Sequence, residues 1–456
     1  MAHLNVYLTT FNAARSPINI DYFAANLFNS LHTDLPPDLI VLSLQEIAPI
    51  AYSFLGGSWL APYLVNFSEA IYRAATARFG KDSRYVSVIA RNVGLTGILV
   101  FARPEVESRI RWIETGGVGC GLWDMGNKGA VGVRLGWSDG GDEAANTFVA
   151  AHLAPMEENW ERRNADWKSI CERLVFERVD KGTGTAPPHK ITNGDDDDQE
   201  PLLSPDTTTN YNEHSMFTPP TYLFFAGDLN YRTSDTKPSP SAPSHDSWPQ
   251  PVDAPSDPKH ITQHLSHDQL SRELSKGNTL HLLTEAPITF APTYKYSSAA
   301  QANVAALAMP REVTETLADG RTVHRTVGPE RREREEEVWL WAKHRVPSWC
   351  DRILYLQNMA QHIQVRAYAA LPIQPTSDHR PVVLSCAVPM QAIEETVKPP
   401  FPIKKDWKQR RAMARRLEVV VGVGAYLTLT WEGRILLAGT VVGLVGGYFA
   451  LVALLG

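Results

Sequence analysis

SDHRPV, at residues 377–382, places a carboxylate and an imidazole at the start of an apolar run. Five further short motifs precede it along the chain, each beside an apolar run of its own. They are LQEI (44–47), GNKGAV (126–131), AHLAP (151–155), GDLNYR (227–232) and PSWCDRIL (347–354). One such motif arises easily by chance, whereas six in this arrangement do not. The sequence therefore predicts a site built where strands give way to loops.

The side chains that these motifs contribute are carboxylates, an amide and imidazoles. They are Glu46, His152, Asp228, Asn230, Asp351, Asp378 and His379. Oxygen ligands of this kind suit a hard cation, and the imidazoles supply acid–base groups. The combination is suited to the cleavage of a phosphate ester.

GDLNYR follows the apolar run TYLFFA. Asp228 and Asn230 are two residues apart, so in extended backbone both side chains point to one face. The amide would ligate a cation or fix a phosphate while the carboxylate takes a proton from water, and Arg232 is a candidate phosphate ligand. The alternative is an ordinary turn. The apolar run before the motif and the Tyr-Arg pair in it favour the functional interpretation.

Two other motifs are ambiguous when taken alone. Glu46 ends the apolar run LIVLSLQE, where a carboxylate is costly unless it is paired or bound to a metal, so ligation and a salt bridge are both open. Asn12, after LTTF, is a similar candidate for orienting that site. Asn127 and Lys128 in GNKGAV are candidate phosphate contacts, and a glycine turn with a solvated lysine is the alternative.

The two motif histidines are candidates for acid–base duty. A lone histidine is more often structural, but His379 and His152 both lie at strand ends of the expected sheets, which favours catalysis. Asp351 is expected to orient a histidine, as carboxylates commonly do. A nucleophilic Cys350 would need an activated thiolate, and no C-x5-R phosphate loop follows it. Cys350 is therefore rejected as the nucleophile.

Eight apolar runs rich in β-branched residues predict buried strands. They are 4–10, 39–44, 96–101, 129–135, 147–151, 222–226, 352–356 and 381–386. Helical periodicity is clearest over 18–31, 68–78 and 156–179. Strands and helices mixed at this spacing predict an α+β domain with two sheets packed face to face and helices outside.

The bulk composition is that of a globular protein. The chain has 456 residues, 43% of them hydrophobic, and a formal net charge of −6. The acidic balance argues against broad nucleic-acid binding. Four cysteines without metal-ligand spacing predict reduced thiols of a cytosolic domain. The first residues show no charged and apolar signal-peptide pattern, so none is expected.

A catalytic domain is expected over residues 1–390. Three stretches poor in core-forming residues are expected to be mobile insertions, at about 180–220, 234–258 and 297–337. The acidic run DDDD at 195–198 is expected to be solvated rather than catalytic. Residues 391–416 are expected to form a Pro-rich and then basic linker, followed by a membrane anchor over 417–456.

The last 22 residues, 435–456, carry no charge. As a helix they would span about 33 Å, close to a hydrocarbon core of about 30 Å, so they predict a membrane span. The basic cluster at 404–416 predicts binding to anionic headgroups on the cytosolic side. Residues 417–430 are too short to cross comfortably. An interfacial helix and the first arm of a hairpin are both open, and one crossing with a cytosolic catalytic domain is favoured.

At GDLNYR, PSWCDRIL and SDHRPV the chain resembles the inositol polyphosphate 5-phosphatases, a branch of the DNase I-like endonuclease/exonuclease/phosphatase family. The resemblance covers residues 1 to about 387 and implies a four-layer αββα sandwich with one Mg²⁺. It implies Glu46 as principal metal ligand, with Asn12 and Asn230 beside the metal and phosphate. It also implies that Asp228 activates water.

For the remaining site residues the resemblance implies contacts to phosphate. His379, supported by Asp378, would contact the scissile phosphate, and His152, with Asp351 behind it, would face the phosphoryl oxygens. Asn164 in RRNAD matches a substrate-contacting position of the family. FAPTYKY (290–296) matches its segment for the neighbouring ring phosphate. The implied ligands of that 4-phosphate are Tyr294, Lys295, Lys343 and Arg345.

The chain also departs from the pattern of the family. About forty extra residues separate PTYKY from Lys343, and Arg380 stands where the family usually has lysine. GLWDMGNKG resembles the membrane-facing apolar loop of the family, with Leu122, Trp123 and Met125 at its rim and a buried tryptophan as the alternative.

The expected activity is Mg²⁺-dependent removal of the 5-phosphate from a membrane phosphoinositide. Phosphatidylinositol 4,5-bisphosphate is the first candidate substrate and the 3,4,5-trisphosphate the second. The alternatives are a nuclease or sphingomyelinase of the same superfamily, or a non-catalytic membrane-anchored lipid-binding protein. A catalytic domain with a hydrophobic tail resembles the small tail-anchored fungal 5-phosphatases of the endoplasmic reticulum. The sequence leaves the oligomeric state open.

Overall fold

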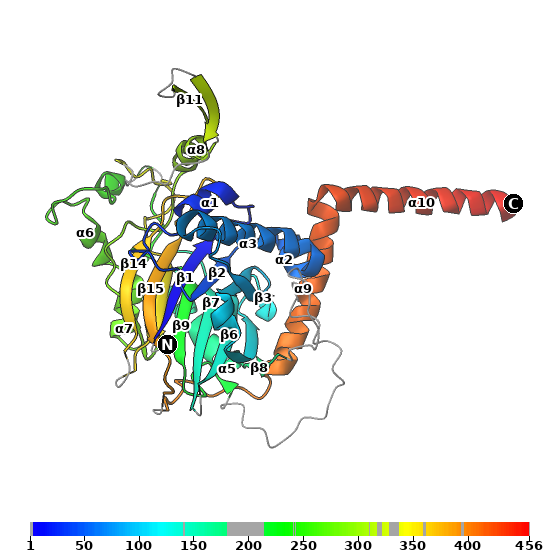
Figure 1. Cartoon of the computed structure of the whole chain (residues 1–456). Helices are drawn as coiled ribbons and strands as arrows, with labels where there is room; N and C mark the ends of the chain where they lie inside the picture. Colours follow the sequence, from blue (N-terminus) through cyan, green and yellow to red (C-terminus); the bar gives the residue numbers. More distant parts are fainter. Residues whose placement is uncertain are drawn as a thin grey trace.

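Two mixed β-sheets form the centre of the protein in the computed structural model (Figure 1). The structure describes residues 3–139, 142–179, 214–239, 241, 243–309, 311–316, 322–327, 337–358, 362–393 and 396–455. The first sheet has the order β14 (Gln364–Ala370), β15 (Val382–Pro389), β1 (His3–Asn12), β2 (Leu39–Gln45), β4 (Thr96–Ala102), β3 (Val86–Val93). The second has the order β10 (Leu283–Glu285), β13 (Asp351–Leu356), β9 (Tyr222–Asp228), β7 (Asp142–His152), β6 (Gly129–Asp139), β5 (Ile110–Gly119), β8 (Glu177–Arg178).

Helices cover the outer face of each sheet. Alternate residues of a strand point to opposite faces, so Leu8 of β1 packs between the sheets while Tyr7 packs outward beneath α1 (Ile20–Asn26) and α3 (Gly57–Phe79). On the second sheet, Phe225 packs outward against Trp167 of α5 (Trp160–Arg173). Because both faces of both sheets are buried, most strands are apolar throughout. The expected αββα layering is confirmed.

The strand directions bring the motifs to one edge. β1 and β2 are parallel, and so are β7 and β9. Their carboxyl ends therefore deliver Asn12, Glu46, His152 and Asp228 to the same edge. β13 is antiparallel to β9 and begins there, with Asp351 paired to Asp228 in the register.

Several expected helix and loop boundaries need correction. The helix expected over 156–179 is shorter, since α5 ends at Arg173 and β8 follows. The helix expected over 68–78 is the second half of α3. Of the expected insertions, residues 180–213 lie outside the described residues. The insertion expected over 297–337 contains α8 (Ser298–Leu307) and the hairpin of β11 (Arg311–Thr316) and β12 (Thr322–Val327).

The insertion expected over 234–258 packs on the body of the domain. Trp248 is buried there, and the Trp341 indole donates a hydrogen bond to the carbonyl of Pro249 (2.7 Å). This stretch contains the short turn η4 (Pro243–Ser247), and the helices α6 (Ile261–Leu265) and α7 (Gln269–Ser275) follow it. It therefore has more tertiary contacts than its Pro-rich composition indicates.

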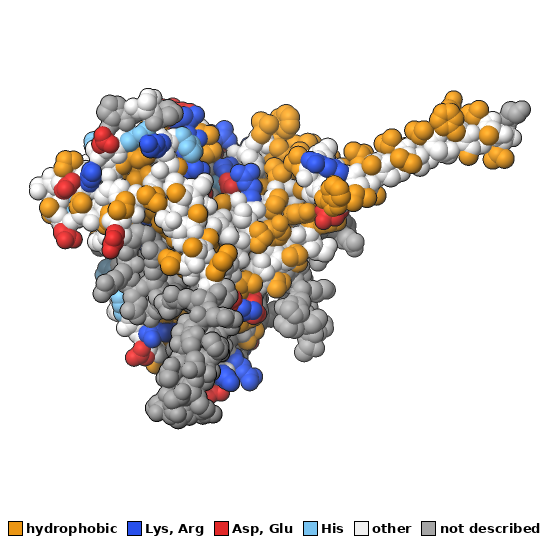
Figure 2. Space-filling model, turned by 90° about the horizontal axis from the view of Figure 1, so that it is seen from above, with side chains coloured by type: hydrophobic (Ala, Val, Ile, Leu, Met, Phe, Trp, Pro, Cys, Tyr) orange, Lys and Arg blue, Asp and Glu red, His pale blue; other side chains and the backbone are white. Residues whose placement is uncertain are grey.

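Two helices form the C-terminal tail. α9 (Trp407–Leu429) runs along the body beside α2 (Ile50–Leu55), and α10 (Trp431–Leu455) projects away from it (Figure 1). The expected boundary between linker and anchor at 416–417 therefore falls inside α9. The helix ends at Leu429 instead, and Thr430 separates it from α10. α10 is long and apolar enough to cross a membrane, with a mean hydropathy of 2.2, and apolar side chains cover it in Figure 2.

A buried arginine ties β13 to the elements around it. The guanidinium of Arg352 lies 3.0 Å from a carboxylate oxygen of Asp268 and 2.6 Å from one of Glu285, and its side chain is 1% exposed. We expect Arg352→Leu to lower the free energy of unfolding by about 3–5 kcal/mol, because it leaves the buried carboxylate of Asp268 and the largely buried carboxylate of Glu285 without their cation. Arg366→Leu, at an exposed position of β14, should change it by less than about 0.5 kcal/mol. Urea denaturation measures both, and equal effects would contradict the expectation.

Candidate active site

Asp228 lies at the centre of the edge where the motifs meet. Its carboxylate accepts a hydrogen bond from the Asn12 amide (2.9 Å) and lies 3.3 Å from Nε2 of His152. The Nε2 atom of His379 is 4.0 Å from the same oxygen. Burial alone would raise the pKa of Asp228, but the two histidines and Arg232 hold it well below its ordinary value. Asp228 is therefore an anion at neutral pH, able to accept a proton from a bound water.

His379 and Asp351 form a buried pair beside Asp228. Nδ1 of His379 is 2.9 Å from the Asp351 carboxylate, which also accepts a hydrogen bond from Thr293 (2.7 Å). Burial would lower the pKa of His379, but Asp351 and Asp228 raise it to about 9. Burial raises the pKa of Asp351 to about 6. Between these values the pair is charged, so Nε2 of His379 presents a proton to the site.

His152 differs from His379 in its neighbours. Nζ of Lys128 lies 2.8 Å from its Nε2, and burial together with this positive charge lowers the pKa of His152. The same ammonium is 3.8 Å from the Glu46 carboxylate, which Arg15 also contacts at 2.8 Å. The pKa values of the two histidines are thus shifted in opposite directions. The surroundings favour the cationic form of His379 and the neutral form of His152.

Glu46 has the chemistry of a metal ligand. Burial would raise its pKa, but His152, Lys128 and Arg15 hold it below its ordinary value, so the group is a carboxylate. Its backbone has a φ of 46°, which is strained for glutamate and turns the chain as it leaves β2. With the Asn12 and Asp228 oxygens nearby in the fold, it provides the oxygen donor set that hard divalent cations prefer.

A second group of possible ligand atoms lies in Asp228, Asp351 and His379, within 4.8 Å of one another. The His379–Asp351 hydrogen bond uses Nδ1 of His379 and one carboxylate oxygen of Asp351, and it leaves Nε2 of His379 and Oδ1 of Asp351 outside it. Both this group and the Glu46 side of the edge therefore have atoms that could bind a cation.

Asn230 and Arg232 form a rigid turn after β9. The side chain of Asn230 donates to the carbonyl of Leu153 (3.1 Å) and accepts a hydrogen bond from Arg232. The Arg232 guanidinium stacks over the Tyr294 ring at 4.4 Å, and Lys295 pairs with Asp378. Arg232, Tyr294 and Lys295 therefore lie together beside His379, whose ring is 4.4 Å from that of Tyr294. These contacts place positive charge next to the acid–base pair.

Four other residues that were predicted to bind substrate have surroundings of their own. Asn164 accepts a hydrogen bond from the Tyr231 hydroxyl and donates to Glu273, so its side chain is engaged in a buried network. Lys343 is exposed, and Arg345 contacts Glu157 and Met156. Oδ1 of Asn127 is buried without a hydrogen-bond partner among the described residues. Their roles in substrate binding stay predictions.

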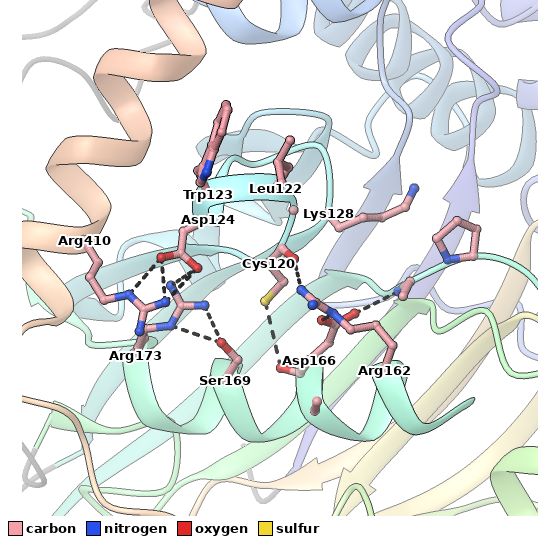
Figure 3. A pocket seen from close by; sticks show the side chains of 14 residues that line it. Cys120, Leu122, Trp123, Asp124, Lys128, Arg162, Asp166, Ser169, Arg173 and Arg410 are labelled. Carbon is pink, nitrogen blue, oxygen red and sulfur yellow. Dashed lines mark hydrogen bonds and ion pairs between the residues drawn. The ribbon is translucent and has the colours of Figure 1, made fainter. Parts of the chain in front are cut away.

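A pocket of about 770 Å³ adjoins the site and shares Lys128 with it (Figure 3). Leu122 and Trp123 stand at its rim and are 64% and 67% exposed, which excludes the alternative of a buried tryptophan. Met125, expected beside them, is instead buried against Phe54 and Leu95. Arg410 of α9 reaches into the same pocket, where it pairs with Asp124.

Three residues of the site were not predicted as candidates. Thr293 supports Asp351, Arg15 pairs with Glu46, and the Ser377 hydroxyl donates to the backbone carbonyl of Asn12 (2.6 Å). Thr293 and Ser377 belong to quoted motifs, FAPTYKY and SDHRPV, which could have identified them. Arg15 follows an ordinary loop and carries no such signal. Cys350 is buried, and burial raises the pKa of its thiol, in agreement with its rejection as a nucleophile.

Comparison with known families and curated proteins relates the chain to phosphatases. Residues 9–306 and 330–385 match the Endonuclease/Exonuclease/phosphatase family 2. The type II inositol 1,4,5-trisphosphate 5-phosphatase of Mus musculus is 26% identical over 356 residues, which are 77% of this chain and 27% of that protein. The type IV inositol polyphosphate 5-phosphatase 9 of Arabidopsis thaliana is 25% identical over 366 residues, 76% of this chain and 69% of that protein.

The match with a human relative covers a smaller part of that protein. The phosphatidylinositol 3,4,5-trisphosphate 5-phosphatase 1 of Homo sapiens is 28% identical over 286 residues, 62% of this chain and 18% of that protein. The chain thus spans about a quarter of the mouse relative and less than a fifth of the human one.

A solved structure has the same fold. The inositol polyphosphate 5-phosphatase domain of SPsynaptojanin, in complex with inositol (1,4)-bisphosphate and calcium ion, aligns with a TM-score of 0.56 and 19% identity, covering 92% of this chain and 90% of that chain. With the family match extending over most of the chain, and with strand-end carboxylates and histidines gathered at one edge, the protein belongs to the endonuclease/exonuclease/phosphatase family 2, and its homologues are inositol polyphosphate 5-phosphatases.

Proposed function

We propose that the protein is a Mg²⁺-dependent phosphoinositide 5-phosphatase that acts on phosphatidylinositol 4,5-bisphosphate at a membrane surface. The observation that carries the proposal is the charged His379–Asp351 pair beside ionised Asp228, with Arg232 and Lys295 at its side. A base, an acid and cations thus surround one place where a phosphate ester would lie. The names of the homologues, an inositol 1,4,5-trisphosphate 5-phosphatase and an inositol polyphosphate 5-phosphatase, support the 5-phosphate of an inositol ring as the ester that is cleaved.

The reaction is the attack of water on the 5-phosphorus. Asp228 holds the water and takes its proton, while the new phosphorus–oxygen bond forms opposite the bond to the ring oxygen. That bond breaks, and the ring oxygen takes a proton from solvent to leave as a hydroxyl group, while Asp228 returns the proton that it accepted to solvent. Inorganic phosphate is released. Nε2–H of His379 donates to a phosphoryl oxygen and stabilises its charge. A Mg²⁺ ion held by Glu46 with Asn12 would polarise the phosphoryl oxygens.

The rest of the substrate fits the positive side of the site. Lys295 and Arg232 provide charges for the neighbouring 4-phosphate, and Lys128 beside His152 provides one for the scissile group. The exposed Leu122 and Trp123 at the pocket rim suit contact with a bilayer, and α10 would hold the domain there. The expected endoplasmic-reticulum location and the cytosolic side of the domain remain predictions.

The full chain in vesicles tests the proposal. With Mg²⁺ we expect phosphate release from phosphatidylinositol 4,5-bisphosphate, and none from phosphatidylinositol 4-phosphate, because the site is proposed to cleave only the 5-phosphate. Malachite-green detection of phosphate measures both, and chromatography of the deacylated lipid product against 4-phosphate and 5-phosphate standards identifies the phosphate that is lost. Equal release from the two lipids, or none from either, would contradict the proposal.

A further inference from the structure

Helix α9 packs on the catalytic domain as one of its own elements. Leu417 joins a small core with Phe54, Leu95 and Met125. Gly422 of α9 lies so close to α2 that a methyl group there would meet Phe54 at 3.0 Å. The Tyr426 ring lies 4.7 Å from that of Trp59. The segment between the domain and the apolar helix is therefore docked along most of its length.

One acidic side chain of α9 is fully buried in this contact. Glu418 is 0% exposed and accepts a hydrogen bond from the backbone N–H of Gly126 at 2.7 Å. Arg411 and Arg415 lie 3.0 and 3.5 Å from its carboxylate, and Arg415 also donates to the carbonyl of Phe54. Burial of a carboxylate is costly without such partners. Its only backbone donor among the described residues belongs to the GNKGAV motif, two residues before Lys128.

A short chain of backbone hydrogen bonds leads from Glu418 to the metal-binding side of the site. Gly126 donates to Glu418 and accepts from the N–H of Leu95 (3.0 Å). The carbonyl of Leu95 in turn accepts from the N–H of Ile47 (3.3 Å), the residue next to Glu46. A side chain on Gly94, whose φ is 51°, would meet the Gly126 carbonyl at 2.3 Å, so the two loops are in close contact.

A second link attaches α9 to the same loop. Arg410 forms two hydrogen bonds with the Asp124 carboxylate, at 2.8 and 3.0 Å, and Arg173 of α5 pairs with that carboxylate from the other side (Figure 3). Asp124 has a φ of 62° and follows Trp123, with a φ of 52°. These left-handed conformations are unfavourable for non-glycine residues, so the loop needs contacts that hold it in place.

We propose that Glu418 is a positioning residue of the active site, through which the membrane-proximal helix α9 fixes Lys128 and Glu46 in their working positions. The helix is then part of the catalytic domain rather than a flexible tether. The inference rests on the proposed function only for the role of Glu46 at the metal. It also assigns a reason for the buried acid in an otherwise apolar and basic helix, since a leucine there would leave the N–H of Gly126 unpaired.

The test compares Glu418→Ala, Glu418→Gln and Arg410→Ala with Asp34→Ala in the full chain in detergent micelles. Asp34 is 98% exposed and lies outside the site, so it controls for the loss of a carboxylate. Two readouts are the binding of Mn²⁺ alone, by electron paramagnetic resonance, and kcat and KM on the water-soluble inositol 1,4,5-trisphosphate. The soluble substrate removes any effect of membrane contact, and the melting temperature monitors folding.

We expect Glu418→Ala to weaken Mn²⁺ binding about tenfold and to lower kcat more than it raises KM, because groups that orient a metal ligand typically contribute a factor of about 10–100 to affinity. Glu418→Gln, which keeps an acceptor for Gly126, should restore most of the affinity. Arg410→Ala should weaken it about threefold, and Asp34→Ala should not change it. Unchanged Mn²⁺ affinity in folded Glu418→Ala or, should that variant not fold, in Arg410→Ala would overturn the inference.

The two proposals fail in different ways. If the unaltered chain binds Mn²⁺ but releases no phosphate, the proposed function is wrong, while the Mn²⁺ affinities of the variants still decide the role of Glu418.

Discussion

Asp228→Asn should abolish phosphate release almost completely, with kcat lowered by about 10³-fold. General-base groups contribute about 10²–10⁴-fold to the rate of a reaction. The Asp228 carboxylate is the anion that the side chains of Asn12, His152 and His379 surround. Asparagine has nearly the same shape and can still accept from the backbone N–H of Asn230, which donates to Asp228 at 3.1 Å. The substitution therefore removes the base and its charge while the turn after β9 is kept.

The control for this prediction is the same chemical change at a surface position. Asp34 is 98% exposed and pairs with Arg78, so Asp34→Asn should leave kcat unchanged. Initial rates on phosphatidylinositol 4,5-bisphosphate vesicles with Mg²⁺ measure both variants, and circular dichroism establishes that each is folded. A loss of less than about tenfold in folded Asp228→Asn would show that another group takes the proton.

The sequence predicts the strands and the site residues at their ends better than it predicts the contacts of the segments around them. Every strand predicted from an apolar run is present, because burial of both faces leaves long apolar stretches in the sequence. The apolar runs do not predict β3, β5 and β14, since the side chains of these strands are mostly half-buried or exposed. They also miss the short strands β8 and β10, and the hairpin of β11 and β12 lies in a stretch expected to be an insertion. The site residues at strand ends were found for the same reason as the strands. Asp351, His379 and Asp228 lie where an apolar run meets a polar motif.

Contacts between distant segments were beyond the reach of the sequence. Glu418 meets Gly126 across 292 residues, and neither residue has a local pattern that indicates a partner. For the stretch 417–430 the sequence therefore allows both an interfacial helix and the first arm of a hairpin, whereas the structure packs it along α2 as part of α9. Asn164 is a second example. Its motif predicts a contact with substrate, which stays a prediction, but no local pattern indicates its hydrogen bonds with Tyr231 and Glu273.

Asp351→Asn should move the alkaline limb of the pH profile of kcat/KM from near pH 9 to near pH 7. Burial opposes the charge of His379, and the carboxylates of Asp351 and Asp228 raise its pKa to about 9. Without the Asp351 charge the pKa of His379 should return toward its ordinary value of about 6.5. Asparagine still accepts from Nδ1, so the ring keeps its orientation. The proton on Nε2 is then lost at a lower pH, although the ring remains in the site.

The size of this effect depends on pH, which separates it from a loss of folding. With a midpoint near 7, about one tenth of the variant carries the His379 proton at pH 8, so kcat/KM should fall about tenfold further there than at pH 6. The raised pKa also stabilises the folded chain below pH of about 6.5, and this contribution is lost as pH rises through about 9. Profiles from pH 5.5 to 10 for the unaltered chain, Asp351→Asn and Asp34→Asn provide the measurement. An alkaline limb that stays near 9 in Asp351→Asn would mean that loss of the Nε2 proton of His379 does not set this limb, because Asp351 makes the largest of the contributions that raise the pKa of His379.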